Sequence, residues 1–166
     1  CARLLGLPYP GGPHLSKLAE EGNREKFHLT IPMIESGDFD FSFSGLKTAV
    51  LNLVQNHSEI LLQEQLRADL AASVEWTIVQ SLIKKTIPAA NKFKVNQVVV
   101  SGGVAANNTL REELEKNCQL KIKNCQLYAP PLNLCTDNGA VVATCAYFNH
   151  HPQDPLIVQA NPGLSL

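Results

Sequence analysis

The chain has 166 residues, enough for one ordinary domain with a buried core. Hydrophobic residues make up 45% of it and charged residues 17%, which are the proportions of a globular protein and argue against a large disordered region. With 14 basic and 15 acidic side chains the formal net charge is −1, which argues against a protein that binds nucleic acid over its whole surface. A contact with nucleic acid would have to be a local basic patch, or be shared with a partner.

The cysteines form an odd set without a CxxC pair, so neither a disulfide framework nor a zinc knuckle is expected, and reduced thiols are the default. They are Cys1, Cys118, Cys125, Cys135 and Cys145. No apolar run approaches the roughly 20 residues that a membrane helix needs, and no signal peptide is visible. We therefore expect a soluble protein of the cytoplasm, or of the mitochondrion if the source is organellar.

The first segment, residues 1–7, is typical of the second half of an amphipathic helix, with no capping residue before it. The chain does not begin with methionine, and its only one is Met33. Both features predict a fragment cut inside a helix. A rigid Pro-Gly turn is expected at 9–13, followed by a short helix over 14–21 that stops at Gly22. An extended stretch is then expected over 27–33, and a strand or extended loop over 38–43.

Two helices are predicted next. Ser44 is a candidate N-cap for the first, because one face follows it at helical spacing; that face consists of Leu46, Val50, Leu53, Val54 and His57. The second, longer helix repeats an apolar residue every four positions at Leu66, Leu70, Val74, Ile78 and Leu82. Pro88 is expected to end or kink it. For the lysines on these helices (Lys47, Lys84 and Lys85) a solvated face is the favoured interpretation and phosphate contact the alternative.

A buried β-branched strand is expected over 97–100, and it leads directly into Ser101-Gly102-Gly103. Asn107 or Asn108 can cap the helix that follows, and Thr109 stands at capping-box spacing from Glu112. A second strand over 126–128 and a helix over 140–148 complete the pattern, and the tail from His151 lacks periodicity. The order of elements indicates an α/β fold with a helical insertion at about 44–93 and an α/β portion at about 94–150.

The segment 98–108 combines a strand, a diglycine turn and a helix start. Gly102 and Gly103 carry no Cβ, so a ligand can approach the backbone closely there. The free N–H groups of the next helix favour an anion or a ribose edge, and the Asn107 amide can both donate and accept. An ordinary tight connection between strand and helix remains the alternative, because glycine-rich turns of this kind are common.

Asp137 lies in the loop 135–139 at a predicted helix start. Taken alone, it is more simply interpreted as the cap of that helix than as a metal ligand or catalytic acid. The five histidines (His14, His28, His57, His150 and His151) show neither HxxxH nor HExxH spacing, and surface positions are expected. Ser42, Ser44 and Ser101 lack the GxSxG elbow of a serine hydrolase.

Four segments change the weight of these alternatives when they are taken together. They are Leu-Leu-Gly-Leu-Pro-Tyr-Pro-Gly-Gly-Pro (4–13), Asp-Phe-Ser-Phe-Ser-Gly-Leu-Lys-Thr (40–48), Ser-Gly-Gly-Val-Ala-Ala-Asn (101–107) and Cys-Thr-Asp-Asn-Gly-Ala (135–140). In this order they closely resemble the C-terminal half of the TsaD/Gcp family of tRNA N6-adenosine threonylcarbamoyltransferases. The form of the second segment is similar to the bacterial or organellar branch.

The resemblance implies an actin/Hsp70/sugar-kinase (ASKHA) fold of two α/β lobes around a nucleotide cleft. It implies transfer of a threonylcarbamoyl group from threonylcarbamoyl-adenylate to N6 of adenosine 37, in tRNAs that read codons beginning with A. Gly12 and Asn107 would contact the adenylate, and Gly102 and Gly103 would line the same pocket. Asp137 would bind a single divalent metal ion, with iron the first choice and zinc the second, and the ion would act as a Lewis acid on the carbamoyl group. No catalytic side chain is assigned.

The departures from the family pattern matter as well. The HxxxH pair and the Ser-Gly-Gly-His-Thr loop of the family's N-terminal half do not occur in this sequence. We therefore expect the chain by itself to be inactive and to expose a cleft surface that favours self-association. Family partners include a related scaffold subunit (TsaB-like) and a small ATPase (TsaE-like), besides tRNA.

Three other functions stay open at this point. An actin-like ATPase or sugar kinase would share the diglycine turn but needs no segment like 40–48. A metalloendopeptidase, after the family's old O-sialoglycoprotein endopeptidase label, lacks HExxH here. A non-catalytic scaffold paralogue would not need Asp137. The main hypothesis predicts that the diglycine bend, Asn107 and Asp137 face one common hollow.

Overall fold

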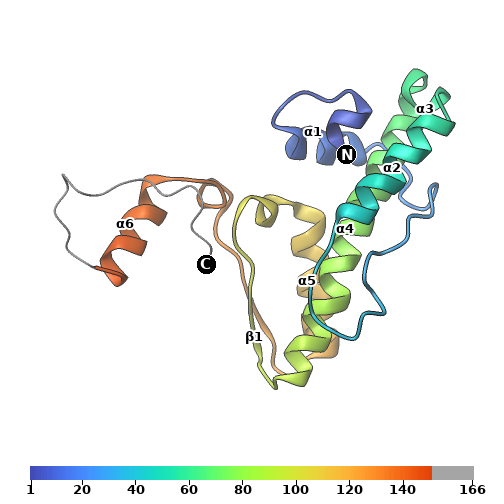
Figure 1. Ribbon diagram of the computed structural model, residues 1–166. Coiled ribbons are helices and arrows are strands. Elements are labelled where there is room, and N and C mark those ends of the chain that lie inside the picture. Colours follow the sequence, from blue (N-terminus) through green and yellow to red (C-terminus); the bar gives the residue numbers. More distant parts are fainter. Residues whose placement is uncertain (151–166) are drawn as a thin grey trace.

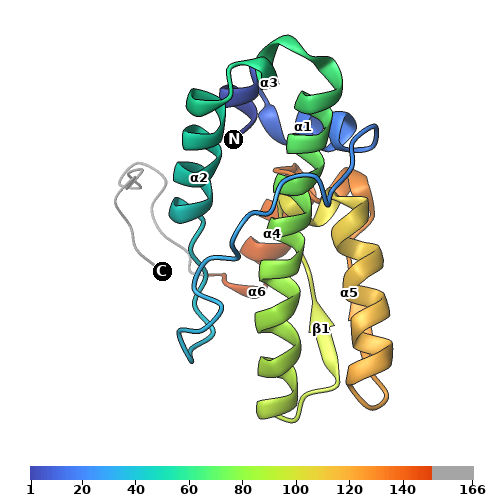
Figure 2. The same cartoon turned by 90° about the vertical axis from the view of Figure 1, so that its right-hand side faces the viewer.

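In the computed structural model, which describes residues 1–150, helix α4 (Glu64–Lys92) is the central element, and most other elements lie along it (Figures 1 and 2). The remaining helices, with η marking short 3₁₀ helices, are η1 (Ala2–Leu5), α1 (Gly11–Ala19), α2 (Ser44–Asn56), α3 (Glu59–Leu62), η2 (Gly103–Ala106), α5 (Asn108–Lys121), η3 (Leu132–Leu134) and α6 (Gly139–Phe148). Strands β1 (Gln97–Val99) and β2 (Gln126–Tyr128) form the sheet. The structure is thus rich in helix with a small parallel sheet.

The first hydrophobic cluster lies where η1, α1, α2 and α3 meet the N-terminal half of α4. Its fully buried members include Leu5, Leu46, Val50, Leu70 and Val74. The face predicted for 44–57 is therefore right at Leu46 and Val50, but His57 is half exposed and lies just beyond α2. The predicted cap is wrong too, because Ser44 is the first residue of α2 and Phe43 holds the cap position without a side-chain bond.

The second hydrophobic cluster lies between the C-terminal half of α4, the sheet and α5. It contains Val79, Ile83, Ile87, Ala90, Val98, Leu110, Leu114, Cys118 and Ile122. Each of the two clusters takes side chains from α4, so this one helix holds both together. Helices α2, α3 and α4 all fall within 44–92, although the division into an insertion and an α/β portion stays a prediction.

Of the two outcomes predicted for Pro88, an end of the helix is wrong, because α4 continues to Lys92, and a kink stays a prediction. The loss of one backbone donor is tolerable here because Pro88 and Lys84, whose carbonyl would have accepted the bond, both lie on the exposed side of the helix. Ile87 and Ala90 are buried on the other side and hold the last turns in place. Tertiary packing therefore outweighs the tendency of proline to end a helix.

The sheet consists of β1 and β2 in parallel, with Gln97 opposite Gln126 and Val99 opposite Tyr128. Both predicted strands are confirmed to within a residue. The predicted burial of the first is wrong at Val99, which is 72% exposed, while Val98 points into the second cluster. Within residues 1–150 the two-stranded sheet is covered by helices on one face, and a strand so placed buries only every second side chain.

Lys85 is buried, contrary to the predicted solvated face, whereas Lys47 and Lys84 are exposed as expected. Its ammonium Nζ lies 2.9 Å from Asp38 Oδ1 and 2.8 Å from Ser36 Oγ. The hydrogen bond from Ser36 and then the one from Lys85 hold the pKa of the Asp38 carboxyl at about 2. The ion pair connects the loop before α2 to the C-terminal third of α4, because a buried ammonium needs such partners.

The N-terminal elements differ in detail from expectation. Helix α1 begins at Gly11, inside the predicted turn, and ends at Ala19 rather than at Gly22. Gly22 has another reason to be glycine, since a Cβ there would lie 2.1 Å from the carbonyl oxygen of Ala68 on α4. No strand forms over 27–33 or 38–43, so the strand predicted as one alternative for the second segment is wrong, and that segment is a loop that begins with a bend at Asp38 and Phe39.

Helix α6 lies apart from the two clusters (Figure 1). None of its residues is buried, and Tyr147 and Phe148 are each more than three quarters exposed. No helix in residues 1–150 has the length and apolar character to cross a membrane. The histidines at 14, 28, 57 and 150 are exposed as predicted, and His151 lies outside the described residues.

Candidate functional site

The candidate site lies at the carboxyl edge of the sheet, where both parallel strands end. Strand β1 leads into Gly102 and Gly103 and then into η2, and β2 leads into the segment that reaches Asp137. In open α/β structures ligands bind outside the carboxyl ends of parallel strands. The third and fourth motifs, 101–107 and 135–140, thus lie on the connections that follow the two adjacent strands.

Gly102 and Gly103 form an open bend. Gly102 has φ +82°, a conformation that side chains other than glycine rarely adopt. A Cβ built on either glycine would meet nothing within 4 Å, and both residues are exposed. The bend therefore leaves free space over its backbone, as close approach of a ligand requires.

Asn107 caps α5, as predicted, and its Oδ1 accepts a hydrogen bond of 2.7 Å from the Leu110 N–H. Its amide nitrogen donates to Ser16 Oγ on α1 at 3.0 Å and to Glu75 Oε1 on α4 at 2.6 Å. One side chain thus connects three helices. The predicted capping box does not form, because Thr109 instead donates to Glu75 Oε2 at 3.1 Å.

Gly12 lies on the first turn of α1, one helical turn before Ser16. Residues four apart share a helix face, so Gly12 lies on the side of α1 that Asn107 reaches through Ser16. Gly12 is exposed, with nothing within 4 Å of a Cβ built on it. The structure thereby brings the first and third motifs to the same region.

Arg111 links the segment that follows β2 to the region around Asn107. It donates to the backbone oxygens of Ala105 and Pro130, and its guanidinium lies 3.1 Å from the sulfur of Cys135. Cys135 is buried, and Asp137 follows two residues later. Asp137 is exposed, and its carboxylate accepts no hydrogen bond from the residues that the structure describes.

The simple capping role considered for Asp137 is wrong, because α6 is capped by Asn138, whose Oδ1 accepts from the Val141 N–H at 3.0 Å. A metal site is not complete either. Across residues 1–150 no group of three or more His, Cys, Asp and Glu side chains could hold a metal ion. A single carboxylate does not fit a divalent ion by itself, since such ions take four or more ligands.

Among the hollows in the described part of the chain are three with volumes of about 350, 450 and 400 Å³. The first lies between α5 and β2, the second beside the end of α4, and the third against α6. None of these three is lined by Gly12, Gly102, Gly103, Asn107 or Asp137. The common hollow predicted for those residues therefore stays a prediction.

Sequence reasoning missed Glu75, Ser16 and Arg111. Glu75 offered a weak signal, since it is a lone carboxylate in the otherwise uncharged stretch 70–83 of α4. Ser16 and Arg111 offered none, because a serine on a short helix and an arginine in a first turn are ordinary surface residues.

Comparison with known proteins identifies the family to which this sequence is similar. The sequence model of the family described as "TsaD: tRNA N6-adenosine threonylcarbamoyltransferase" matches residues 1–144. A Bordetella avium protein named tRNA N6-adenosine threonylcarbamoyltransferase is 51% identical over 87% of this chain and 42% of its own length. One of the same name from Moorella thermoacetica is 42% identical over 99% of this chain and 48% of its own length. The chain thus spans less than half the length of these curated relatives.

Proposed function

The chain belongs to the TsaD family, and from this premise we propose that the protein acts in the transfer of threonylcarbamoyl from threonylcarbamoyl-adenylate to N6 of adenosine 37 in tRNAs reading codons that begin with A. The observation that carries the proposal is the family match over residues 1–144, which includes all four motifs in order. Because the chain spans less than half of its relatives' length, the activity is proposed for the full-length protein.

The open diglycine bend supports a role in binding the adenylate. Gly102 and Gly103 would line the pocket, with their bare backbone against the ligand. Asn107 and Gly12 would contact the adenylate itself. The Asn107 amide nitrogen already donates twice and its Oδ1 already accepts from the Leu110 N–H. Contact with a ribose or phosphate would therefore use the second lone pair of Oδ1 or the other N–H groups at the start of α5.

Preorganisation is the contribution expected from Glu75 and Ser16. They hold the Asn107 side chain by two hydrogen bonds from separate helices, so its position does not depend on the ligand. A binding group fixed before the ligand arrives loses less entropy when it binds. The region therefore positions substrate, and no side chain in it is assigned a catalytic proton transfer.

Asp137 is proposed as one ligand of the family's metal ion, iron in the first place and zinc in the second. The described residues contain no group of three or more His, Cys, Asp and Glu side chains that could hold a metal ion, so ligands would also have to come from elsewhere in the full-length protein. The same reasoning supports the expectation that the 166-residue chain alone is inactive.

The proposal extends to the fold of the full-length protein and to its partners, and family membership supports it. An ASKHA fold of two lobes would place the carboxyl edge of this sheet against a nucleotide cleft. The proposed partners are tRNA, threonylcarbamoyl-adenylate, a TsaB-like scaffold subunit and a TsaE-like ATPase. The net charge of −1 fits a tRNA surface that is shared with such a partner.

The test is a transplant into a full-length relative. This chain would replace the matching segment of the Bordetella avium protein, and the hybrid would be given threonylcarbamoyl-adenylate, unmodified tRNA, divalent iron and the partner subunits. We expect threonylcarbamoyladenosine in digests of the tRNA, measured by mass spectrometry, and a loss of at least tenfold on Asn107→Ala. Lys84→Ala, an exposed change on α4, is the matched control and should leave the product unchanged.

A hybrid that is folded by circular dichroism and forms no product would overturn the proposal. Release of phosphate from ATP without transfer would favour the ATPase or sugar kinase, and cleavage of a glycoprotein would favour the endopeptidase. Product formed equally well without this segment would favour the scaffold paralogue.

A further inference from the structure

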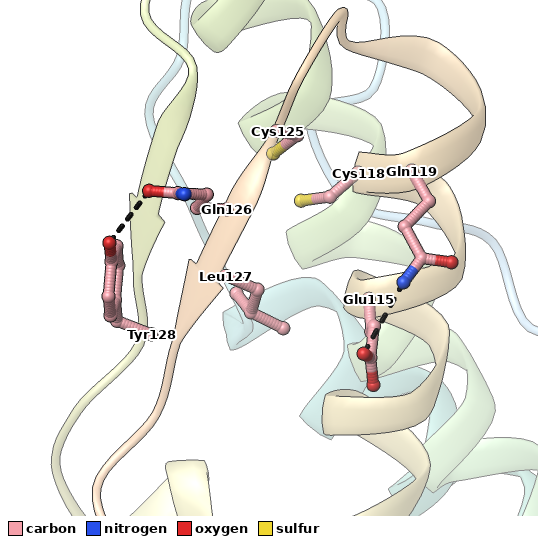
Figure 3. A pocket seen from close by; sticks show the side chains of 7 residues that line it. All are labelled: Glu115, Cys118, Gln119, Cys125, Gln126, Leu127 and Tyr128. Carbon is pink, nitrogen blue, oxygen red and sulfur yellow. Dashed lines mark hydrogen bonds between the residues drawn. The ribbon is translucent and has the colours of Figure 1, made fainter.

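Two cysteines face a hollow away from the candidate site. This hollow of about 350 Å³ lies between α5 and β2 and is lined by Glu115, Cys118, Gln119, Cys125, Gln126, Leu127 and Tyr128 (Figure 3). Cys118 comes from the last turns of α5 and Cys125 stands directly before β2. Figure 3 shows the two sulfur atoms pointing toward each other from these two elements.

The backbone fixes this arrangement. The Ile122 N–H donates to the carbonyl of Cys118 at 3.0 Å, and the Cys125 N–H donates to the carbonyl of Ile122 at 3.3 Å. Asn124, in between, adopts φ +55°, which turns the chain back toward α5. The end of α5 and the tight turn after it thus bring the two cysteines close together.

The two thiols differ in access. Cys118 is 1% exposed, whereas Cys125 is partly exposed on the wall of the hollow. Burial, and next the contact with the Cys125 thiol, raise the pKa of Cys118 to about 12. A thiol that stays protonated is a weak nucleophile, so a reagent from solution should meet Cys125 first.

We propose that Cys118 and Cys125 form a reversible disulfide bond when the protein meets a small-molecule disulfide such as oxidised glutathione. Disulfides of proteins in reducing compartments are usually transient and redox-sensing. Neither the family match nor the candidate site assigns a role to this pair. The inference does not depend on the proposed function.

The exchange balances in two steps. The Cys125 thiolate attacks one sulfur of the small disulfide, a Cys125–sulfur bond forms, the disulfide breaks, and the released thiolate takes up a proton. Cys118 then loses its proton to solvent and attacks the Cys125 sulfur, which expels the second small thiol. Two protein thiols are oxidised and one disulfide is reduced to two thiols. The raised pKa of Cys118 makes the second step the slow one at neutral pH.

The test treats the native 166-residue chain with oxidised glutathione, blocks remaining thiols with iodoacetamide, and maps the products by mass spectrometry. Trypsin cuts after Lys121 and Lys123, so the expected bond joins peptide 117–121 to the peptide that begins at Asn124. Fragmentation would assign the bond to Cys125 rather than Cys135 or Cys145. Dithiothreitol should restore both thiols.

Two variants make the result decisive. In Cys125→Ser, Cys118 should be found unoxidised, since its only facing thiol is gone. In Cys145→Ser, a change of an exposed cysteine on α6, the Cys118–Cys125 bond should form as before. The exposed Cys145 of the unchanged chain should carry glutathione, which proves that the oxidant acted. Cys118 found reduced in that same sample, or bonded only after unfolding in denaturant, would overturn the proposal.

Discussion

Helices α5 and α6 begin alike and end up in different surroundings. Each follows a strand and a short 3₁₀ helix, and each is capped by an asparagine, Asn107 at 2.7 Å and Asn138 at 3.0 Å from the N–H three residues on. Helix α5 buries Leu110, Leu114 and Cys118, whereas α6 buries nothing in the described structure. A cap therefore determines where a helix begins, and it does not determine what the helix packs against.

The two helices differ in surroundings because they differ in side-chain composition. Helix α5 is amphipathic, with three buried residues at a spacing of four and charged residues on its other sides. Helix α6 has no charged residue and is apolar or small throughout. A helix of that composition normally lies inside a protein. Its exposure agrees with a chain that spans less than half of its relatives' length.

The largest effect should come from matched truncations in the two helices. Leu110→Ala removes a fully buried side chain from the second cluster and should destabilise the chain by about 2–5 kcal/mol. Val142→Ala removes a side chain that is 67% exposed and should change stability by less than about 0.5 kcal/mol. Urea unfolding followed by circular dichroism measures both. Equal effects would show that α6 is packed in solution.

The next largest effect should come from Asn107→Ala. It removes the cap of α5 and both links to α1 and α4, and among residues 1–150 it leaves the Glu75 carboxylate with the Thr109 hydroxyl as its one hydrogen-bond donor. We expect a loss of about 1–3 kcal/mol in the free energy of unfolding. Ser16→Ala, which removes one of those links, is the control and should cost less. An unchanged melting temperature in Asn107→Ala would mean that the three-helix junction does not form.

At alkaline pH, Cys118 on α5 and Cys145 on α6 should differ in their effect on the stability of the chain. The pKa of Cys118 is about 12 in the folded chain against an ordinary 9.0, so the folded state holds the proton more tightly. This contribution to stability is complete below pH 9 and is lost as the pH rises toward 12. Melting temperatures of the unchanged chain and of Cys118→Ala should therefore converge across that interval. Cys145→Ala on α6 should follow the unchanged chain throughout.

The smallest effect should come from Asn138→Ala. Loss of its cap costs about 1 kcal/mol of helix stability, but only locally, because α6 does not contribute to either cluster. The main unfolding transition should stay where it is, while amides at the start of α6 exchange faster by nuclear magnetic resonance. A shift of the main transition as large as that of Asn107→Ala would contradict the contrast between the helices.

The sequence predicted what depends on neighbours along the chain. Both strands, the diglycine bend and the Asn107 cap follow from β-branched residues, glycine and short-range capping chemistry, and all were confirmed. The α6 boundary was right within one residue, although the capping residue was Asn138 and not Asp137.

What failed depends on contacts between distant residues. The burial of Lys85 needs Asp38, 47 positions away, to come against it. The Glu75 contact with Asn107 spans 32 positions. Pro88 is tolerated because packing holds the helix on both sides of it, and Val99 is exposed because nothing within residues 1–150 covers that face of the sheet. No local pattern carries such information.

The shared helix α4 has a consequence for how the chain melts. Its 29 residues, about 44 Å at 1.5 Å each, contribute Leu70 and Val74 to one cluster and Val79 and Ile83 to the other without a break between them. Either cluster could unfold alone only if α4 lost its backbone hydrogen bonds between Val74 and Val79, where the helix is continuous. The clusters should therefore unfold as one cooperative unit, and a ligand bound at one end would protect the other.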